Sequence, residues 1–398
     1  MTGSCPTETD EDAVSVRVIG DIAEVDAAEW DACARGTASG AADPHNPFVS
    51  HAFLSALEDA GCVGASAGWL PQHLVVEDDA GTAQAIMPCY LKSHSFGEYV
   101  FDHGWADAFE RAGGQYYPKL QVSVPFTPVT GPRLMARDGG NSGRNTLIAA
   151  ALELCRRHGA SSVHWTFVEQ AEWELLGQFG MLQRTDQQFH WMNARYTDFD
   201  AFLDSLASRK RKAIRRERRG AVENGIEIVR LTGSDITEAH WDAFHAFYMD
   251  TGSRKWGRPY LNRRFFSLIG ERMADRLLLV MARRAGQWIA GALNLVGDRA
   301  LYGRNWGCLE DHPFLHFEVC YYQAIEHAIE TGLDRVEAGA QGAHKLARGY
   351  VPVTTYSAHH IAHPGLRQAV ADYLEKERRY VEEESRLMAE HAPFRKDR

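Results

Sequence analysis

The sequence lacks the signatures of several large protein classes. Its seven cysteines include no C-x-x-C pair, which argues against a disulfide framework and against a zinc ribbon. No apolar run approaches the ~20 residues that a helix needs to cross a bilayer, so no membrane insertion is expected. Residues 1–14 are acidic and polar, without the basic and then apolar layout of a signal peptide, and we expect them to be disordered. These absences predict a reduced, soluble protein of the cytoplasm.

Motifs that define common enzyme classes are missing as well. There is no G-x-S-x-G elbow, no Walker P-loop, no H-E-x-x-H and no G-x-G-x-x-G after a strand. Hydrolase, kinase, dehydrogenase and zinc-protease activities are therefore disfavoured, and no metal site is expected. The net charge of −10 gives the whole protein no general affinity for nucleic acids or membranes.

What the sequence does contain is an internal repeat. Segments 73–88 and 278–293 each consist of an apolar strand, a turn that ends in Ala-Gly, and a second apolar strand. Each follows a helical pattern with aromatic anchors, and each precedes a long apolar helix that ends in glycine and then a short strand. The flanking helices are expected at 47–60, 146–158, 241–249 and 317–331, and the short strands at 163–165 and 336–338.

The repeat predicts an α/β fold with mixed sheets, built as two similar lobes in tandem. A chain of 398 residues with 45% apolar residues is long enough to bury two cores. A cleft between two lobes is a natural place for a ligand. The expected divisions are a first lobe at 15–195, a basic linker helix at 196–225, a second lobe at 226–363 and a C-terminal helix at 364–398.

A run of basic residues is the sharpest charge feature of the chain. Eight of the eleven residues from Arg209 to Arg219 are lysine or arginine, in a protein that is acidic overall. One interpretation is a phosphate clamp, with at least three side chains facing the cleft between the lobes. The alternative is a solubilising helix paired with acidic surface elsewhere. The clamp would use Arg209, Lys210, Arg211, Lys212 and Arg215.

Two segments of the second lobe gather polar groups around expected helix and strand ends. One is the stretch from Tyr302 to Glu318, where Asp311-His312-Pro313 is a helix-start signal. A helix start suits an anion or a developing oxyanion, although His316 is equally consistent with a buried, satisfied histidine and Glu318 with a favourable first-turn carboxylate. The other is the small-residue loop after Glu337, which we interpret as a binding or catalytic loop rather than a purely structural one. Its polar members include Gln341, His344 and Lys345.

These segments together resemble the Fem-like branch of the GNAT superfamily, also described as peptidoglycan biosynthesis/recognition proteins. The resemblance covers roughly residues 46–364. The stretches that carry it are 92–102, 116–120, 125–133, 208–212, 315–318, 320–323, 337–342 and 344–345. It implies tandem GNAT-like lobes and transfer of an acyl or aminoacyl group to an amine, with no tightly bound cofactor.

The resemblance leaves the donor open between acyl-CoA and aminoacyl-tRNA, because the usual GNAT pyrophosphate loop is intact in neither lobe. The acceptor would be a small-molecule amine or a cell-wall precursor. For direct aminolysis the candidate bases are Glu318, Glu337 and His316, and Tyr302 would protonate the leaving group. The remaining substrate-binding candidates are Asp102, Tyr117, Lys119, Arg133, Arg304, Trp306, Gln341, His344 and Lys345.

Two other classes of function stay open at this point. The protein is also consistent with a binding module that recognises a phosphorylated cell-wall precursor or a nucleotide without turnover. A third interpretation is nucleic-acid binding through the basic run. If the chain is an enzyme, Tyr302, His316, Glu318, Glu337 and the loop residues up to Lys345 are expected to converge on one cavity.

Overall fold

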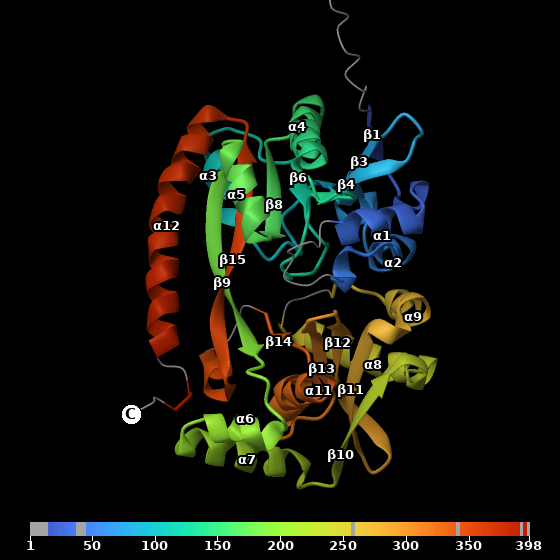
Figure 1. Ribbon diagram of the computed structural model, residues 1–398, viewed down its shortest axis with the longest axis vertical. Coiled ribbons are helices and arrows are strands. Elements are labelled where there is room, and N and C mark those ends of the chain that lie inside the picture. Colours follow the sequence, from blue (N-terminus) through green and yellow to red (C-terminus); the bar gives the residue numbers. More distant parts are fainter. Residues whose placement is uncertain (1–14, 37–44, 256–258, 340–342, 391–392, 396–398) are drawn as a thin grey trace, which may run out of the picture.

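The computed structural model describes residues 15–36, 45–255, 259–339, 343–390 and 393–395, and it has the expected mixed α/β fold (Figure 1). The described residues form two sheets. The small sheet has four strands in the order β1-β3-β4-β7, and the large sheet has eleven in the order β10-β11-β12-β13-β14-β9-β15-β8-β6-β5-β2. None of the described helices combines the length and apolar character that a bilayer-spanning segment requires. The predicted disorder of residues 1–14 concerns a segment outside the described part of the chain.

The first half of the chain supplies the small sheet and one end of the large sheet. Its strands are β1 (Ser15–Ile19), β2 (Trp69–Pro71), β3 (His73–Glu77), β4 (Ala83–Met87), β5 (Tyr90–Lys92), β6 (Lys119–Val122), β7 (Met135–Ala136), β8 (Ser162–Val168) and β9 (Leu182–Met192). Its helices are α1 (Ala27–Gly36), α2 (His51–Asp59), α3 (His103–Arg111), α4 (Asn141–His158) and α5 (Gln170–Gln178), and a 3-10 turn, η2 (Pro47–Val49), precedes α2. The β3–β4 hairpin and α4 are the predicted elements of the first repeat.

The second half supplies the other end of the large sheet. Its strands are β10 (Ile226–Thr232), β11 (Leu277–Arg284), β12 (Gln287–Val296), β13 (Ala300–Cys308), β14 (Arg335–Glu337) and β15 (Tyr350–Ile361). Its helical elements are α6 (Phe199–Ser205), α7 (Ser208–Val222), α8 (Glu238–Lys255), α9 (Arg263–Arg272), α10 (Leu315–Phe317), the π-helical turn η6 (Glu318–Tyr322), α11 (Gln323–Thr331), the 3-10 segment η7 (Ala343–Arg348) and α12 (Pro364–Glu390).

The repeated hairpins share their turn geometry but not their sheet. Gly81 and Gly286 both have φ of +79°, a conformation that glycine adopts without steric cost. The β3–β4 hairpin lies in the small sheet, whereas β11–β12 lies in the large one. The order of helix, hairpin, helix and strand therefore recurs as predicted, while the strands around each hairpin differ.

The two halves are joined through the large sheet. Strand β9 pairs with β14 on one side and with β15 on the other, and β15 also pairs with β8. By sequence β15 falls in the expected second lobe at 226–363, but in space it lies between two strands of the first. The expected assignment of residues 350–361 to the second lobe therefore does not follow the sheet, because β8 and β9 would each keep an unpaired edge without β15. Helix α12 covers β9 and β15 from outside (Figure 1).

Apolar packing also crosses between the halves. Phe53 of α2 meets Phe265 of α9 edge to face, with ring centroids 5.7 Å apart, and Phe48 meets Tyr302 of β13 at 5.2 Å. These residues belong to one buried cluster that draws on both halves. The cluster holds the first half against the face of β12 and β13, where the candidate site lies.

Candidate functional site

A gap between two parallel strands forms the centre of the candidate site. Strands β13 and β14 pair from Ala300↔Arg335 to Tyr302↔Glu337, where β14 ends, while β13 continues to Cys308. Beyond that point a pocket opens beside β13. Its lining residues are Ala292, Leu293, Asn294, Gly303, Arg304, Asn305, Trp306, His316, Cys320, Tyr321 and Ala338. The pocket therefore lies where β13 continues past the end of β14.

The helix beside this gap has an unusual backbone. Phe314 adopts a positive φ of 66° immediately before α10, and the helix then passes through the π-helical turn η6 before it continues as α11. Single π-helical turns are frequent at functional sites because they redirect side chains locally. Here Cys320 and Tyr321 of η6 both line the pocket.

Aromatic and imidazole rings form one wall of the pocket. The ring of His316 lies 5.2 Å from that of Trp306 and 5.3 Å from that of Tyr321, measured between centroids. The Tyr321 hydroxyl is 3.0 Å from Nε2 of His344. His316, one of the residues expected to converge on a cavity, and Trp306, a substrate-binding candidate, line this pocket, and His344 reaches its wall through Tyr321.

Glu337 faces a histidine that the sequence did not single out. Glu337 and His190 of β9 are cross-strand neighbours, with Oε2 and Nε2 3.6 Å apart. Both side chains are buried, and neither of these two atoms has a hydrogen-bond partner among the described residues. The other carboxylate oxygen of Glu337 accepts from Nε of Arg335 at 2.8 Å. Burial lowers the pKa of His190, which leaves the imidazole neutral and able to accept a proton.

Lys345 lies at the end of the gap. Its Nζ donates to the carbonyl oxygens of Ala338 at 2.5 Å and Gly339 at 3.1 Å. Burial lowers the pKa of this lysine to about 8. A lysine with such a pKa exchanges a proton near neutral pH, which is the property required of an acid–base group. Gln341, predicted from the same loop, lies outside the described residues.

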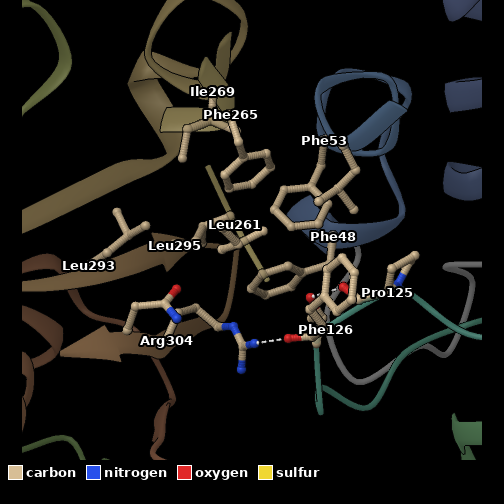
Figure 2. Close-up of a pocket in the computed structure, with 13 residues that line it drawn as sticks. Phe48, Phe53, Pro125, Phe126, Leu261, Phe265, Ile269, Leu293, Leu295 and Arg304 are labelled. Atoms are coloured by element: carbon tan, nitrogen blue, oxygen red, sulfur yellow. Dashed lines mark hydrogen bonds between the residues drawn. The ribbon is translucent and has the colours of Figure 1, made fainter. Parts of the chain in front are cut away.

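Arg304 stands between this pocket and a second one. Its Nη2 donates to the carbonyl oxygen of Phe126 at 2.7 Å, a contact between the two halves that Figure 2 shows. Arg304 lines both pockets, as do Leu293 and Asn305. The second pocket is mostly apolar and is enclosed by both halves of the chain.

Three predicted substrate-binding residues of the first half form a separate buried network. Lys119 is fully buried and donates to Ser95 Oγ at 2.8 Å, to Glu98 Oε2 at 2.7 Å and to Asp102. The Tyr117 hydroxyl joins the network at Ser95, 2.9 Å away. Although burial opposes the lysine charge, the two carboxylates raise its pKa. The structure gives Lys119, a substrate-binding candidate from the sequence, two carboxylate partners inside the protein, those of Glu98 and Asp102.

Arg133 also has a structural role instead of the predicted one. Its fully buried guanidinium donates to the backbone carbonyls of Val129, Gly131, Pro132 and Thr166. This side chain is surrounded by protein and fixes the turn at 129–133. It has no surface at which a substrate phosphate could bind.

Two of the predicted catalytic residues point away from the gap. Glu318 is buried and accepts hydrogen bonds from Arg218 of α7, at 2.9–3.2 Å, and from Gln323 at 2.7 Å. Tyr302 is fully buried against Phe48 in the apolar cluster. The expected convergence on one cavity is therefore only partial. Glu318 is held in an ion pair, and Tyr302 has no exposed surface for a leaving group.

The basic run forms helix α7, as predicted, but it does not face a cleft between the halves. Helices α6 and α7 lie at the outer end of the second half (Figure 1), where α7 packs on α10, η6 and η7. Arg211 pairs with Asp204 and Arg215 with Asp200, each at 2.8 Å. The prediction that at least three basic side chains face the cleft between the lobes is wrong, because the elements that α7 packs against, α6, α10, η6, η7 and β10, all belong to the second half.

Four cations of α7 nevertheless form one exposed stripe. Arg209, Lys212, Arg216 and Arg219 are all exposed and follow the 3-4-3 spacing of a single helix face, over ~15 Å. No ion pair of these four is found within the described ranges. Lys210, by contrast, is only half-buried and lies off this face. We call these four residues the cationic stripe.

Several site residues carry no motif that a reader of the sequence could find. His190 sits in a long strand and reaches Glu337 only through the β9–β14 register. Cys320 and Tyr321 belong to the segment 320–323, which contributes to the family resemblance, but the sequence does not show that they line the pocket, because their orientation depends on the π-helical turn. Among the described residues there is no group of three or more side chains suited to hold a metal ion.

Solved structures share the overall fold. The crystal structure of FemX superposes with a TM-score of 0.55 at 13% identity, covering 87% of this chain and 98% of that one. The C-terminal domain of a putative lysylphosphatidylglycerol synthetase from Agrobacterium fabrum gives 0.55 at 10% identity, covering 89% and 97%. L-PGS from Bacillus licheniformis gives 0.53 at 11% identity, covering 88% and 97%. At such identities the likeness shows the fold alone.

Sequence comparison gives the family. No curated protein matches the chain significantly. The family described as FemAB-like, peptidoglycan biosynthesis/recognition, matches residues 21–396, nearly the whole length and both halves. The chain therefore belongs to the FemAB-like family of peptidoglycan biosynthesis and recognition proteins.

Proposed function

We propose that this protein transfers an aminoacyl group from an aminoacyl-tRNA to an amine of a peptidoglycan precursor. The observation that carries the proposal is the pocket where β13 and β14 separate, with Arg304, His316 and Lys345 around it. A preorganised set of polar groups at such a gap suits an activated carbonyl that develops negative charge. The family supports an acceptor from peptidoglycan biosynthesis. An aminoacyl-tRNA donor implies that the protein works in the cytoplasm.

In the reaction one bond forms and one breaks, the acceptor amine loses a proton, and the leaving ribose oxygen gains one. The acceptor amine nitrogen attacks the ester carbonyl carbon, and the bond to the ribose oxygen breaks. The pair of Glu337 and His190 accepts the proton of the amine, since His190 is neutral and the carboxylate stabilises the imidazolium. Lys345 gives a proton to the leaving ribose oxygen. Arg304 offsets the negative charge that develops on the carbonyl oxygen.

The cationic stripe supports an RNA-linked donor over acyl-CoA. Helix α7 packs directly on α10 and η6, and η6 residues Cys320 and Tyr321 line the pocket. The exposed stripe therefore lies on the outer side of the same elements. Four cations along ~15 Å suit a phosphodiester backbone.

The decisive experiment supplies both substrates to the full-length protein. Aminoacyl-tRNA carrying a radiolabelled amino acid is incubated with a nucleotide-linked muramyl peptide that has a free side-chain amine, and labelled product is quantified and identified by mass spectrometry. Amine-dependent release of free tRNA is the expected result. Release of thiol from acyl-CoA instead would assign the other donor. Tight binding of the muramyl peptide without turnover of either donor would establish the binding module.

A further inference from the structure

One carboxylate interrupts the basic run. Glu217 is the only acidic residue between Arg209 and Arg219, and its side chain is 14% exposed. Its Oε2 accepts a hydrogen bond from the hydroxyl of Tyr322 and another from Nη2 of Arg348, the latter at 2.9 Å. Neither the cationic stripe nor the proposed reaction uses this residue. Glu217 instead joins α7 to η6 and η7, the two elements that lie beside the gap.

Arg348 closes η7 at its C-terminal end. Its Nη1 donates to the carbonyl oxygen of His344 at 2.7 Å, and its guanidinium lies 3.4 Å from the centroid of the Phe317 ring. The Arg348 side chain is only 7% exposed. A cation so far removed from water needs a carboxylate, because an unpaired charge inside a protein is costly. Glu217 supplies that carboxylate, and the ion pair fixes η7 on α7, which it contacts directly.

The second partner of Glu217 belongs to the wall of the pocket. Tyr322 is fully buried and is the last residue of η6, whose Cys320 and Tyr321 line the pocket. Burial raises the pKa of the Tyr322 hydroxyl, so the hydroxyl keeps its proton and donates to the carboxylate. A single carboxylate of α7 is therefore bonded to the pocket wall and to the segment that carries Lys345.

We propose that Glu217 is a positioning residue that, through Arg348, holds η7 so that Lys345 stays buried at the end of the gap. The proposal rests on the proposed function, in which Lys345 gives a proton to the leaving ribose oxygen. Lys345 is 4% exposed, and its Nζ reaches the carbonyl oxygens of Ala338 and Gly339 just after β14. These contacts require η7 to stay against the end of that strand. Glu217 and Arg348 act only through this segment.

Loss of the ion pair should change both kcat and its dependence on pH. Burial lowers the pKa of Lys345 to about 8, so a loosened η7 that admits water should let this pKa rise toward ~10.4, the ordinary value of lysine. The alkaline limb of the pH–rate profile should then move to higher pH. The other titratable groups that interact with Lys345 are Cys320, His190 and His344, and they stay the same in the variants used.

Two variants remove the ion pair from opposite sides. Glu217→Gln keeps the shape and an acceptor for Tyr322 but loses the charge, and Arg348→Met keeps an unbranched side chain beside Phe317. Each should lower kcat by up to ~10²-fold, the cost of a small misplacement of a reacting group. The KM for aminoacyl-tRNA should stay close to that of wild type, because the cationic stripe is intact. The double variant should lose little more than either single one, since both act on one contact.

Two controls disturb α7 without touching η7. Asp204→Asn removes an exposed ion pair of this helix, with N and O 2.8 Å apart. Arg218→Ala removes a more buried one, whose carboxylates are those of Glu318 and Glu326. Arg218→Ala therefore reports what a general loss of stability does. Both controls should leave the position of the alkaline limb unchanged.

The experiment measures the proton affinity of Lys345 with and without turnover. Profiles of kcat against pH are recorded with radiolabelled aminoacyl-tRNA and the nucleotide-linked muramyl peptide. In parallel, each protein without substrates is labelled with trace acetic anhydride at a series of pH values, and mass spectrometry of the peptide that contains Lys345 gives its titration curve. Circular dichroism establishes that each variant is folded. An upward shift of both curves in Glu217→Gln and Arg348→Met, absent from the two controls, would support the proposal.

The results that would overturn it are distinct from those that would overturn the proposed function. Curves for Glu217→Gln and Arg348→Met that coincide with wild type would remove the positioning role while the transfer reaction stands. An equal shift in Arg218→Ala would also remove it, since any loss of stability would then suffice. A shifted labelling curve in a protein that transfers nothing from any donor would retain the positioning of Lys345 and overturn the proposed function.

Discussion

Removal of the Arg218 guanidinium should destabilise the fold far more than removal of a neighbouring arginine. In the Arg218→Ala variant the Glu318 carboxylate, only 3% exposed, keeps one side-chain hydrogen bond, from Gln323. Breaking a buried ion pair by deleting one partner costs ~3–5 kcal/mol. Because 23% of the Arg218 side chain is exposed, we expect the lower end, ~3 kcal/mol.

The control is on the same helix. Arg215 pairs with Asp200, and their side chains are 50% and 76% exposed, so Arg215→Ala should change the free energy of unfolding by less than ~1 kcal/mol. Urea denaturation followed by tryptophan fluorescence measures both variants, and a shift of the midpoint at constant slope reports the change in stability. Glu318→Gln should likewise lose stability, while the folded enzyme keeps kcat within a few-fold of wild type.

Equal urea midpoints for Arg218→Ala and wild type would refute the reasoning about the ion pair. A stable Glu318→Gln variant with ~100-fold lower kcat would also refute the structural role of Glu318 and would identify this residue as the general base.

Three further predictions concern the reaction and its donor. If Lys345 protonates the leaving group, kcat should be highest below a pH of about 8 and should fall as the pH rises through that value and the lysine loses its proton. Lys345→Arg should move this alkaline limb of the pH–rate profile to higher pH. An unmoved limb would exclude the lysine. Glu337→Gln and His190→Asn should each lower kcat ~10²–10⁴-fold with little change in thermal midpoint, and near-wild-type rates in both would remove the pair as the base. Reversing charge with Arg209→Glu and Lys212→Glu should weaken tRNA binding and reduce its dependence on salt, measured by filter binding at several salt concentrations. The slope of log K against log salt concentration should be smaller in magnitude by ~0.7–0.9 for each phosphate that the variant no longer neutralises. An unchanged slope would show that the cationic stripe does not contact the RNA.

Local sequence signals predicted most of the elements. Both hairpins formed where expected. Each Ala-Gly turn lies between two apolar strands, and its glycine adopts a positive φ that is unfavourable for other residues, so the turn is specified by the local sequence. The helix that follows each hairpin, α4 and α11, is likewise terminated by a glycine in the left-handed conformation.

The roles of charged residues were harder to predict because their partners are distant in sequence. Arg218 is neutralised by a carboxylate one hundred residues away, and Lys119 by two carboxylates from the preceding loop. A basic or acidic residue in a sequence shows its charge but not whether the fold already supplies the counter-ion. His190 was missed for the related reason that only strand register brings it to Glu337.

The position of β15 has a consequence for how the chain reaches its native state. Residues 350–361 emerge late in synthesis, yet they are the strand that joins β8 to β9. Until they arrive, a polypeptide that already contains residues 1–345 has two strand edges open to incorrect pairing. Pairings between strands so far apart in sequence form slowly, because the intervening loop must close first. The first half is therefore expected to complete its folding only after residues 350–361 have left the ribosome, and a shortened product that ends before β15 should aggregate instead of yielding an independent domain.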